Sequence, residues 1–106
     1  MALASSLLPI DMDVALDVHI ALIPEHCRSG LLAYLRYGRR PGDFLRAVLS
    51  NDLAAACRHA DSLNRTLLST YVFVLSHYAP DDAWGSPDNV EQWIARGNEL
   101  RKAEAT

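Results

Sequence analysis

The sequence contains little cysteine, a single lysine and no long apolar run. Two of its 106 residues are cysteines, Cys27 and Cys57, which is too few for a disulfide framework. No apolar stretch approaches the roughly 20 residues that a membrane span needs, and the first residues lack the basic region of an export signal. We therefore expect a cytoplasmic protein with two reduced thiols and no membrane segment.

Catalytic and metal-binding motifs are also lacking. The sequence has no phosphate-binding loop, dinucleotide fingerprint or serine nucleophile elbow. Its close pairs of histidine and cysteine, His26 with Cys27 and Cys57 with His59, are one or two residues apart. On a helix such neighbours point in different directions, so neither pair can converge on one ion. The sequence predicts a protein without catalytic residues, metal or cofactor, and not an enzyme.

One further polar group, His59, Asp61 and Asn64, lies close together in the sequence. We interpret Asp61 as the ion-pair partner of Arg65, one helical turn later. Asn64 is interpreted as a hydrogen-bonded polar side chain within an apolar stripe. This interpretation makes the group structural and not catalytic.

Composition and length favour one small, soluble, mainly α-helical domain over residues 1–106. Half of the residues are hydrophobic and 22% are charged, which is enough apolar material for a core. The spacing of apolar residues predicts a compact bundle of about four helices. An N-terminal segment, residues 1–23, precedes these helices, and a polar tail, residues 98–106, is expected to be frayed.

Helix start and stop residues give the expected boundaries. Pro24 begins the first helix at its first position and Gly38 ends it, while Asp43 caps a second helix that ends at Ser50 and Asn51. Asp52 caps the longest element, whose stripe continues to about Tyr78, either unbroken or with a break near Asp61 and Ser62. Ser86 and Pro87 begin the last helix, which stops at Gly97. The expected core consists of Leu31, Leu35, Phe44, Val48, Leu53, Cys57, Leu67, Tyr71, Val74, Trp93 and Ile94.

Residues 11–23 have a different pattern, in which apolar side chains alternate with aspartate, alanine and histidine. This alternation is typical of a half-buried β-strand, so the fold class includes an N-terminal β-strand or irregular segment. A lone strand would leave unpaired backbone groups, and we then expect a homodimer through residues 11–23 or pairing with a sheet of the target. A helical segment would remove this reason to dimerise.

The candidate partner-binding residues surround the expected turn after the first helix. Residues 25–60 hold six arginines against three acidic residues, although the whole chain has a net charge of −3. Arginine makes bidentate contacts with carboxylate or phosphate and stacks on aromatic rings. The alternative is a solvated face whose arginines pair with the protein's own carboxylates. Trp84 either covers the core or anchors an interface. The candidates are Arg36, Tyr37, Arg39, Arg40, Arg46 and Trp84.

Over about residues 23–97 the sequence resembles small accessory proteins of bacteriophages and prophages. Its most specific parts are the segments Ser50-Asn51-Asp52-Leu53 and Trp84-Gly85-Ser86-Pro87. The resemblance implies a phage-encoded protein in the cytoplasm of the bacterial host. It also implies binding and inhibition of a host protein or a defence complex, for example as an anti-CRISPR protein. A nucleic-acid-binding regulator that uses the arginines is the alternative.

Overall fold

The computed structural model describes residues 6–105, and these residues contain helices and no β-strand. Seven α-helices and two 3₁₀ turns lie in this range, more than the four helices that the sequence predicts. In chain order they are α1 (Ile10–His19), η1 (Ile20–Leu22), α2 (Glu25–Tyr37), α3 (Asp43–Leu49), α4 (Leu53–His59), α5 (Ser62–Thr66), α6 (Leu68–Tyr78), η2 (Asp81–Ala83) and α7 (Pro87–Ala105). None of these helices is both long and apolar enough to cross a membrane.

The predicted N-terminal strand is wrong, because α1 and η1 make residues 10–22 helical. A helix turns by about 100° per residue, so a step of two residues reaches the opposite face and a step of four returns to the same face. Alternating apolar residues therefore form two rows on opposite sides of α1. Met12, Leu16 and Ile20 pack on the core, whereas the other row is exposed. Since the helix satisfies its own backbone, the strand-based reason for a dimer disappears.

The boundaries of α2 follow the predicted signals closely. Pro24 is the residue before the helix and not its first residue, while Gly38 ends it in the left-handed conformation with φ of 64°. The helix α3 ends at Leu49 with Ser50 as the residue that follows it, and Asn51 also has a positive φ, of 62°. Gly38 thus ends α2 as predicted, whereas the prediction of Asp43 as a cap is wrong, because Asp43 is the first residue of α3 and Gly42 precedes it without a side-chain capping bond.

The expected stripe from Asp52 to Tyr78 is divided into α4, α5 and α6. The carboxylates of Asp52 and Asp61 accept from the N–H groups of Ala55 and Asn64, so each of them caps a short helix. The break after Ala60 confirms one of the two alternatives for this segment. Because α4 is a separate helix, its face does not continue the stripe of α6. Leu53 and Cys57 are exposed for this reason, and their assignment to the core is wrong.

The start of α7 is as predicted, since the Ser86 hydroxyl accepts from the N–H of Asn89 at 3.1 Å. Its end is not, because the helix continues through Gly97 to Ala105. Gly97 lies where α7 meets the end of α2, and a Cβ there would overlap the carbonyl oxygen of Tyr37. The glycine allows this close approach and does not stop the helix. The prediction of a frayed tail from residue 98 is therefore wrong for residues 98–105.

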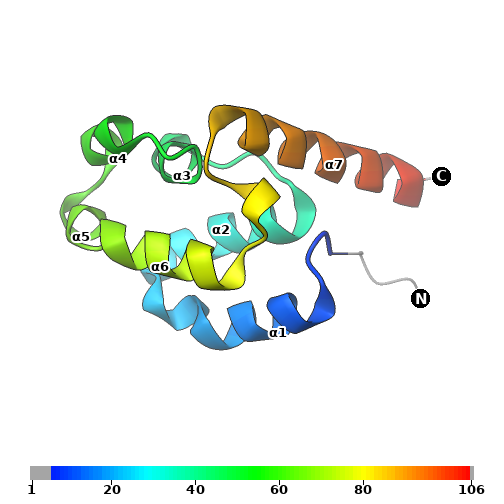
Figure 1. Cartoon of the computed structure of the whole chain (residues 1–106), viewed down its shortest axis with the longest axis horizontal. Helices are drawn as coiled ribbons and strands as arrows, with labels where there is room; N and C mark the ends of the chain where they lie inside the picture. Colours follow the sequence, from blue (N-terminus) through cyan, green and yellow to red (C-terminus); the bar gives the residue numbers. More distant parts are fainter. Residues whose placement is uncertain (1–5, 106) are drawn as a thin grey trace.

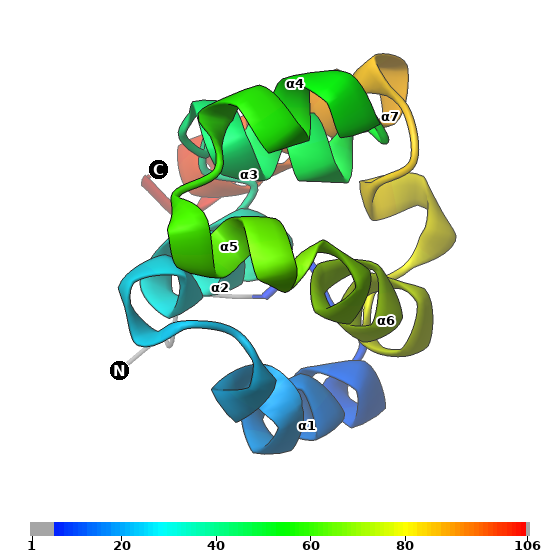
Figure 2. The same cartoon turned by 90° about the vertical axis from the view of Figure 1, so that its left-hand side faces the viewer.

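The helices are arranged around α2 and α6. Figures 1 and 2 place α1 on one side of these two helices and α3 and α4 on the other side. The buried apolar side chains form one cluster with contributions from every α-helix except α5. Leu31, Leu35, Val48, Tyr71, Val74, Trp93 and Ile94 are buried as predicted, and Phe44 and Leu67 are partly buried.

Candidate partner-binding face

The C-terminal end of α2 is held firmly against α7. The indole N–H of Trp93, a fully buried side chain, donates to the carbonyl oxygens of Tyr34 and Leu35 at 3.0 and 3.2 Å. The guanidinium of Arg101 donates to the carbonyl oxygen of Tyr37. These donors satisfy the backbone groups that a helix leaves unpaired at its C-terminal end. The backbone that leads into Arg39 and Arg40 is therefore fixed in position.

Three of the predicted arginines point into solvent from this part of the fold. Arg40 donates from both terminal nitrogens to the carboxylate of Glu91 on α7, at 3.0 and 2.9 Å. The bond from Arg40 is the main reason that the pKa of Glu91 is below its ordinary value. Arg39 and Arg46 are exposed, and within residues 6–105 their guanidinium groups make no hydrogen bond or ion pair. We call Arg39, Arg40 and Arg46 the arginine face.

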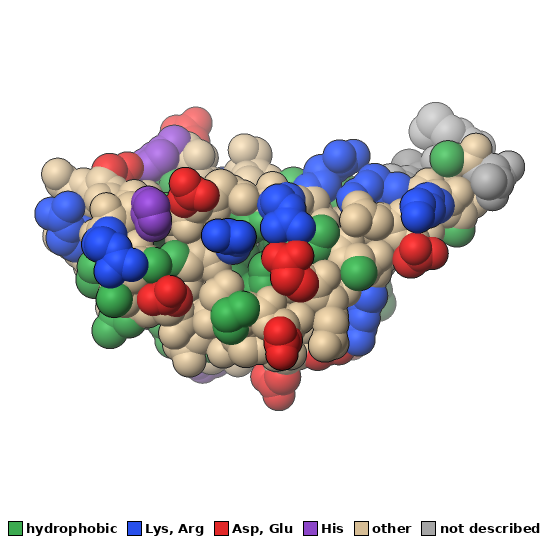
Figure 3. All heavy atoms as spheres, turned by 90° about the horizontal axis from the view of Figure 1, so that it is seen from above, with side chains coloured by type: hydrophobic (Ala, Val, Ile, Leu, Met, Phe, Trp, Pro, Cys, Tyr) green, Lys and Arg blue, Asp and Glu red, His purple; other side chains and the backbone are tan. Residues whose placement is uncertain are grey.

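Acidic side chains lie among these arginines. Figure 3 looks onto α3, α4 and α7 and shows Lys and Arg along the whole length of this side, with Asp and Glu between and beside them. A hollow of about 220 Å³ next to Arg46 is also lined by Asp43, Asp52 and Glu91. The arginine face is thus interspersed with carboxylates and does not form a continuous basic patch.

Arg36 belongs to a different part of the molecule. Its Nε donates to Asp13 at 2.6 Å and one terminal nitrogen donates to Asp17 at 2.7 Å. The side chains of Arg36 and Asp13 are 20% and 19% exposed, so this ion pair is largely shielded from water. Arg36 therefore holds α1 against α2. For Arg36, the alternative of pairing with the protein's own carboxylates is correct.

The two aromatic candidates lie partly in the interior. Trp84 is partly buried against the core, and its carbonyl oxygen accepts from the side-chain amide of Asn89 at 2.9 Å. Tyr37 is also partly buried at the end of α2. No hydrogen bond, ion pair or ring contact links either ring to the three arginines. The structure brings Arg40 and Arg46 close to Glu91 of α7 and leaves Arg39 exposed next to Arg40 in the chain, but it does not join Trp84 to them.

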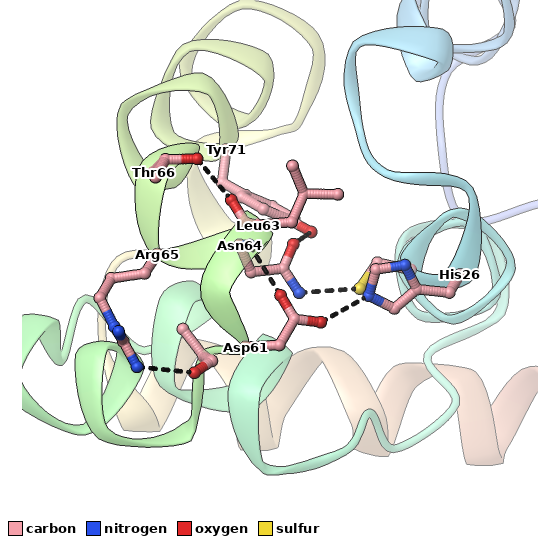
Figure 4. A network of polar contacts seen from close by, with 9 residues as sticks. His26, Asp61, Leu63, Asn64, Arg65, Thr66 and Tyr71 are labelled. Atoms are coloured by element: carbon pink, nitrogen blue, oxygen red, sulfur yellow. Dashed lines mark hydrogen bonds and ion pairs between the residues drawn. The ribbon is translucent and has the colours of Figure 1, made fainter.

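A second polar cluster connects α2 to α5 and α6 (Figure 4). The buried Asn64 accepts from the Tyr71 hydroxyl at 2.7 Å and donates to the sulfur of Cys27 at 3.4 Å. This confirms the structural interpretation of Asn64. Asp61 pairs with His26 at 2.9 Å, whereas Arg65 donates to the carbonyl oxygen of Ala60, so the predicted pair of Asp61 and Arg65 is wrong.

The sequence reading missed the pair of His26 and Asp61 because their 35-residue separation gives no local signal. Their side chains are about half exposed, and the bond joins the start of α2 to the start of α5. Among the described residues no cluster of three or more His, Cys, Asp or Glu side chains could hold a metal ion. The cluster connects helices and gives both the oxygen and the nitrogen of the Asn64 side chain a hydrogen-bond partner.

The second feature that the sequence reading missed is the exposed row on α1. Ile10, Val14 and Val18 are 76%, 58% and 69% exposed, and Leu22 on η1 is 47% exposed. Their spacing of four residues is visible in the sequence. The predicted strand, however, placed these residues in one row with Met12, Leu16 and Ile20, so a separate exposed row was not predicted. An exposed row of large apolar side chains is typical of a contact surface.

No known family model, curated protein or solved structure matches this chain. The evidence for the arginine face and for the exposed row on α1 therefore comes from their geometry alone.

Proposed function

We propose that the protein is a non-enzymatic phage accessory protein that binds a host protein or defence complex through its arginine face. The observation that carries the binding role is that Arg39 and Arg40 directly follow the end of α2, which α7 holds in place, and that Arg46 is exposed on α3. Side chains on a rigid scaffold lose less conformational freedom on binding than those on a mobile loop. The phage setting and the cytoplasmic location rest on the resemblance over residues 23–97.

The mixture of charges favours a protein partner over a nucleic acid. A phosphate backbone carries negative charge at every step, and Asp43, Asp52 and Glu91 would repel it. A protein surface offers separate carboxylates and basic groups that can match both signs. The pair of Arg40 and Glu91 is exposed, and such pairs contribute little to stability, so a partner's carboxylate can replace Glu91.

Capture from a host lysate, read by mass spectrometry, tests this proposal. The Arg39→Glu/Arg46→Glu variant should keep its fold and lose the proteins that the wild type retains. The Arg58→Glu/Lys102→Glu variant has the same net charge and should retain them, because neither residue belongs to the arginine face. A folded Arg39→Glu/Arg46→Glu variant with wild-type capture would exclude this face. Retention of nucleic acid with a steep fall as salt rises would favour the regulator instead.

A further inference from the structure

The helix α1 has an apolar row that its own fold does not cover. Eight large apolar side chains are exposed in the described residues, and four of them lie on α1 and η1: Ile10, Val14, Val18 and Leu22. Ile10, Val14 and Val18 are spaced by four residues and form a ridge along one side of the helix. Figures 1 and 2 show α1 at the outside of the molecule, with α2 and α6 on its inner side only.

The attachment of α1 does not depend on this outer row. On its inner side Leu16 is fully buried, and Met12 and Ile20 pack on the core. On its flank Asp13 and Asp17 bind Arg36. The outer row thus contributes little to folding of the single chain, while its contact with water is unfavourable. An apolar partner surface would remove that contact.

The charges at the two ends of this segment indicate which surface covers it. Asp11 lies in the first turn of α1 and is exposed. At the other end the guanidinium of Arg28 donates to the carbonyl oxygens of Ile23 and Ala21, at 2.7 and 3.2 Å. Asp11 therefore places a negative charge at the start of the segment and Arg28 of α2 places a positive charge beside its end, while Asp17 between them is paired with Arg36. Two copies aligned in opposite directions place each acidic end beside a basic end, whereas parallel copies place like charges together.

We propose that the outer row of α1 packs against the same row of a second copy, giving a symmetric antiparallel dimer. Each Asp11 then lies beside Arg28 of the partner subunit. Identical ridges with a spacing of four residues can interdigitate, and Ile and Val lose little side-chain freedom because they are branched at Cβ. An interface of one short helix from each copy is small, so the dimer forms in the micromolar range or above. This contact is separate from the arginine face.

Sedimentation of the full chain from micromolar to millimolar concentration tests the dimer. The wild type should change from monomer to dimer over this range. Val14→Glu should raise the dissociation constant by at least about tenfold, since it places two carboxylates in an apolar contact. Leu53→Glu is the matched control, because Leu53 is 68% exposed on α4 and lies outside the row. A wild type that stays monomeric throughout, or a Val14→Glu variant that dimerises like the wild type, would overturn the proposal.

A charge exchange tests the antiparallel direction. Asp11→Arg alone and Arg28→Glu alone should each weaken the dimer, because each places like charges at both ends of the contact. A mixture of the two variants should form a heterodimer of nearly wild-type affinity, since opposite charges then meet at both ends. Melting curves of each variant check that the fold is retained. A mixture that dimerises no better than either variant by itself would contradict the antiparallel arrangement.

Discussion

Among the glycines of the described fold, Gly38 and Gly97 have the least room for a Cβ. A Cβ on Gly38 would lie 2.6 Å from the carbonyl oxygen of Trp93, and Gly38 also has a left-handed φ of 64°. A Cβ on Gly97 would overlap the backbone of Tyr37 and Gly38. Backbone atoms cannot move aside as a flexible side chain can, so the crossing of α2 and α7 requires both glycines.

We predict that Gly97→Ala destabilises the protein by about 3 kcal/mol or more, in spite of the better helix propensity of alanine. The control is Gly30→Ala, also inside a helix, where the new Cβ meets only a methyl group of Leu45 at 3.3 Å. There the gain in propensity of about 1 kcal/mol offsets the small displacement, and stability should stay near wild type. Denaturant unfolding of both variants measures the difference. Equal stability of the two variants would show that the helices do not cross this closely.

At the scale of single residues, the carboxylate of Asp61 also makes the stability of the fold depend on pH. Its pKa is below the ordinary value, chiefly because the N–H of Asn64 donates to it and further because His26 does. A carboxyl group with a lowered folded-state pKa stabilises the fold above its unfolded-state pKa, near 4, and this contribution is lost as the pH falls through the folded-state pKa. Asp61→Asn keeps a capping side chain but cannot titrate.

We therefore predict that the melting temperature of Asp61→Asn falls less steeply below about pH 4 than that of the wild type. Thermal melts at a series of acidic pH values provide the comparison. Identical acid profiles for wild type and Asp61→Asn would mean that this carboxylate does not contribute.

At the scale of the helices, α1 depends on a polar anchor as well as on apolar packing. Arg36 joins it to α2 through two short hydrogen bonds. We predict that Arg36→Ala destabilises the fold by about 2 kcal/mol, because it leaves the shielded Asp13 without its partner. Arg39→Ala should change stability by no more than about 0.5 kcal/mol. Thermal or denaturant melts compare the stability of the two variants. If Arg36→Ala is as stable as the wild type, Arg36 becomes a candidate binding residue again.

The sequence predicts helix ends well where a short-range signal decides them. Gly38, Asp52 and Ser86 act as predicted because their roles depend only on neighbouring backbone groups. Prediction from the sequence fails where a contact with a distant part of the chain determines the position of a residue. From the sequence alone, Gly97 is expected to end a helix, but it lies inside α7 where the end of α2 packs on it. Arg36 is expected to be a free surface arginine, but it pairs with Asp13 of α1. The alternation in α1 is compatible with a strand or with a helix that has two apolar faces.

Leu35 and Leu53 show how division into separate helices changes the core. Leu35 is fully buried on α2, whereas Leu53 is exposed at the first turn of α4. We predict that Leu35→Ala costs about 2–5 kcal/mol. Leu53→Ala should cost no more than about 0.5 kcal/mol, as expected for a surface position. If denaturant unfolding gave similar losses for both, α4 would have to pack differently.

At the scale of the whole molecule, the protein has two separate surfaces of different chemistry. The arginine face consists of Arg39 and Arg40 between α2 and α3 and Arg46 on α3, with acidic side chains beside it, whereas the outer row of α1 is apolar. Figures 1 and 2 place α1 and α3 on opposite sides of α2 and α6. The two surfaces can therefore be occupied at the same time, by a partner protein on one side and a second copy on the other.

Capture of the partner by two variants side by side tests the central claim, that the arginine face binds and the α1 row assembles. We predict that the Val14→Glu variant retains the proteins captured by the wild type although it sediments as a monomer. The Arg39→Glu/Arg46→Glu variant should lose these proteins although it still dimerises. Loss of capture by Val14→Glu together with full capture by the arginine variant would contradict the assignment of the two surfaces.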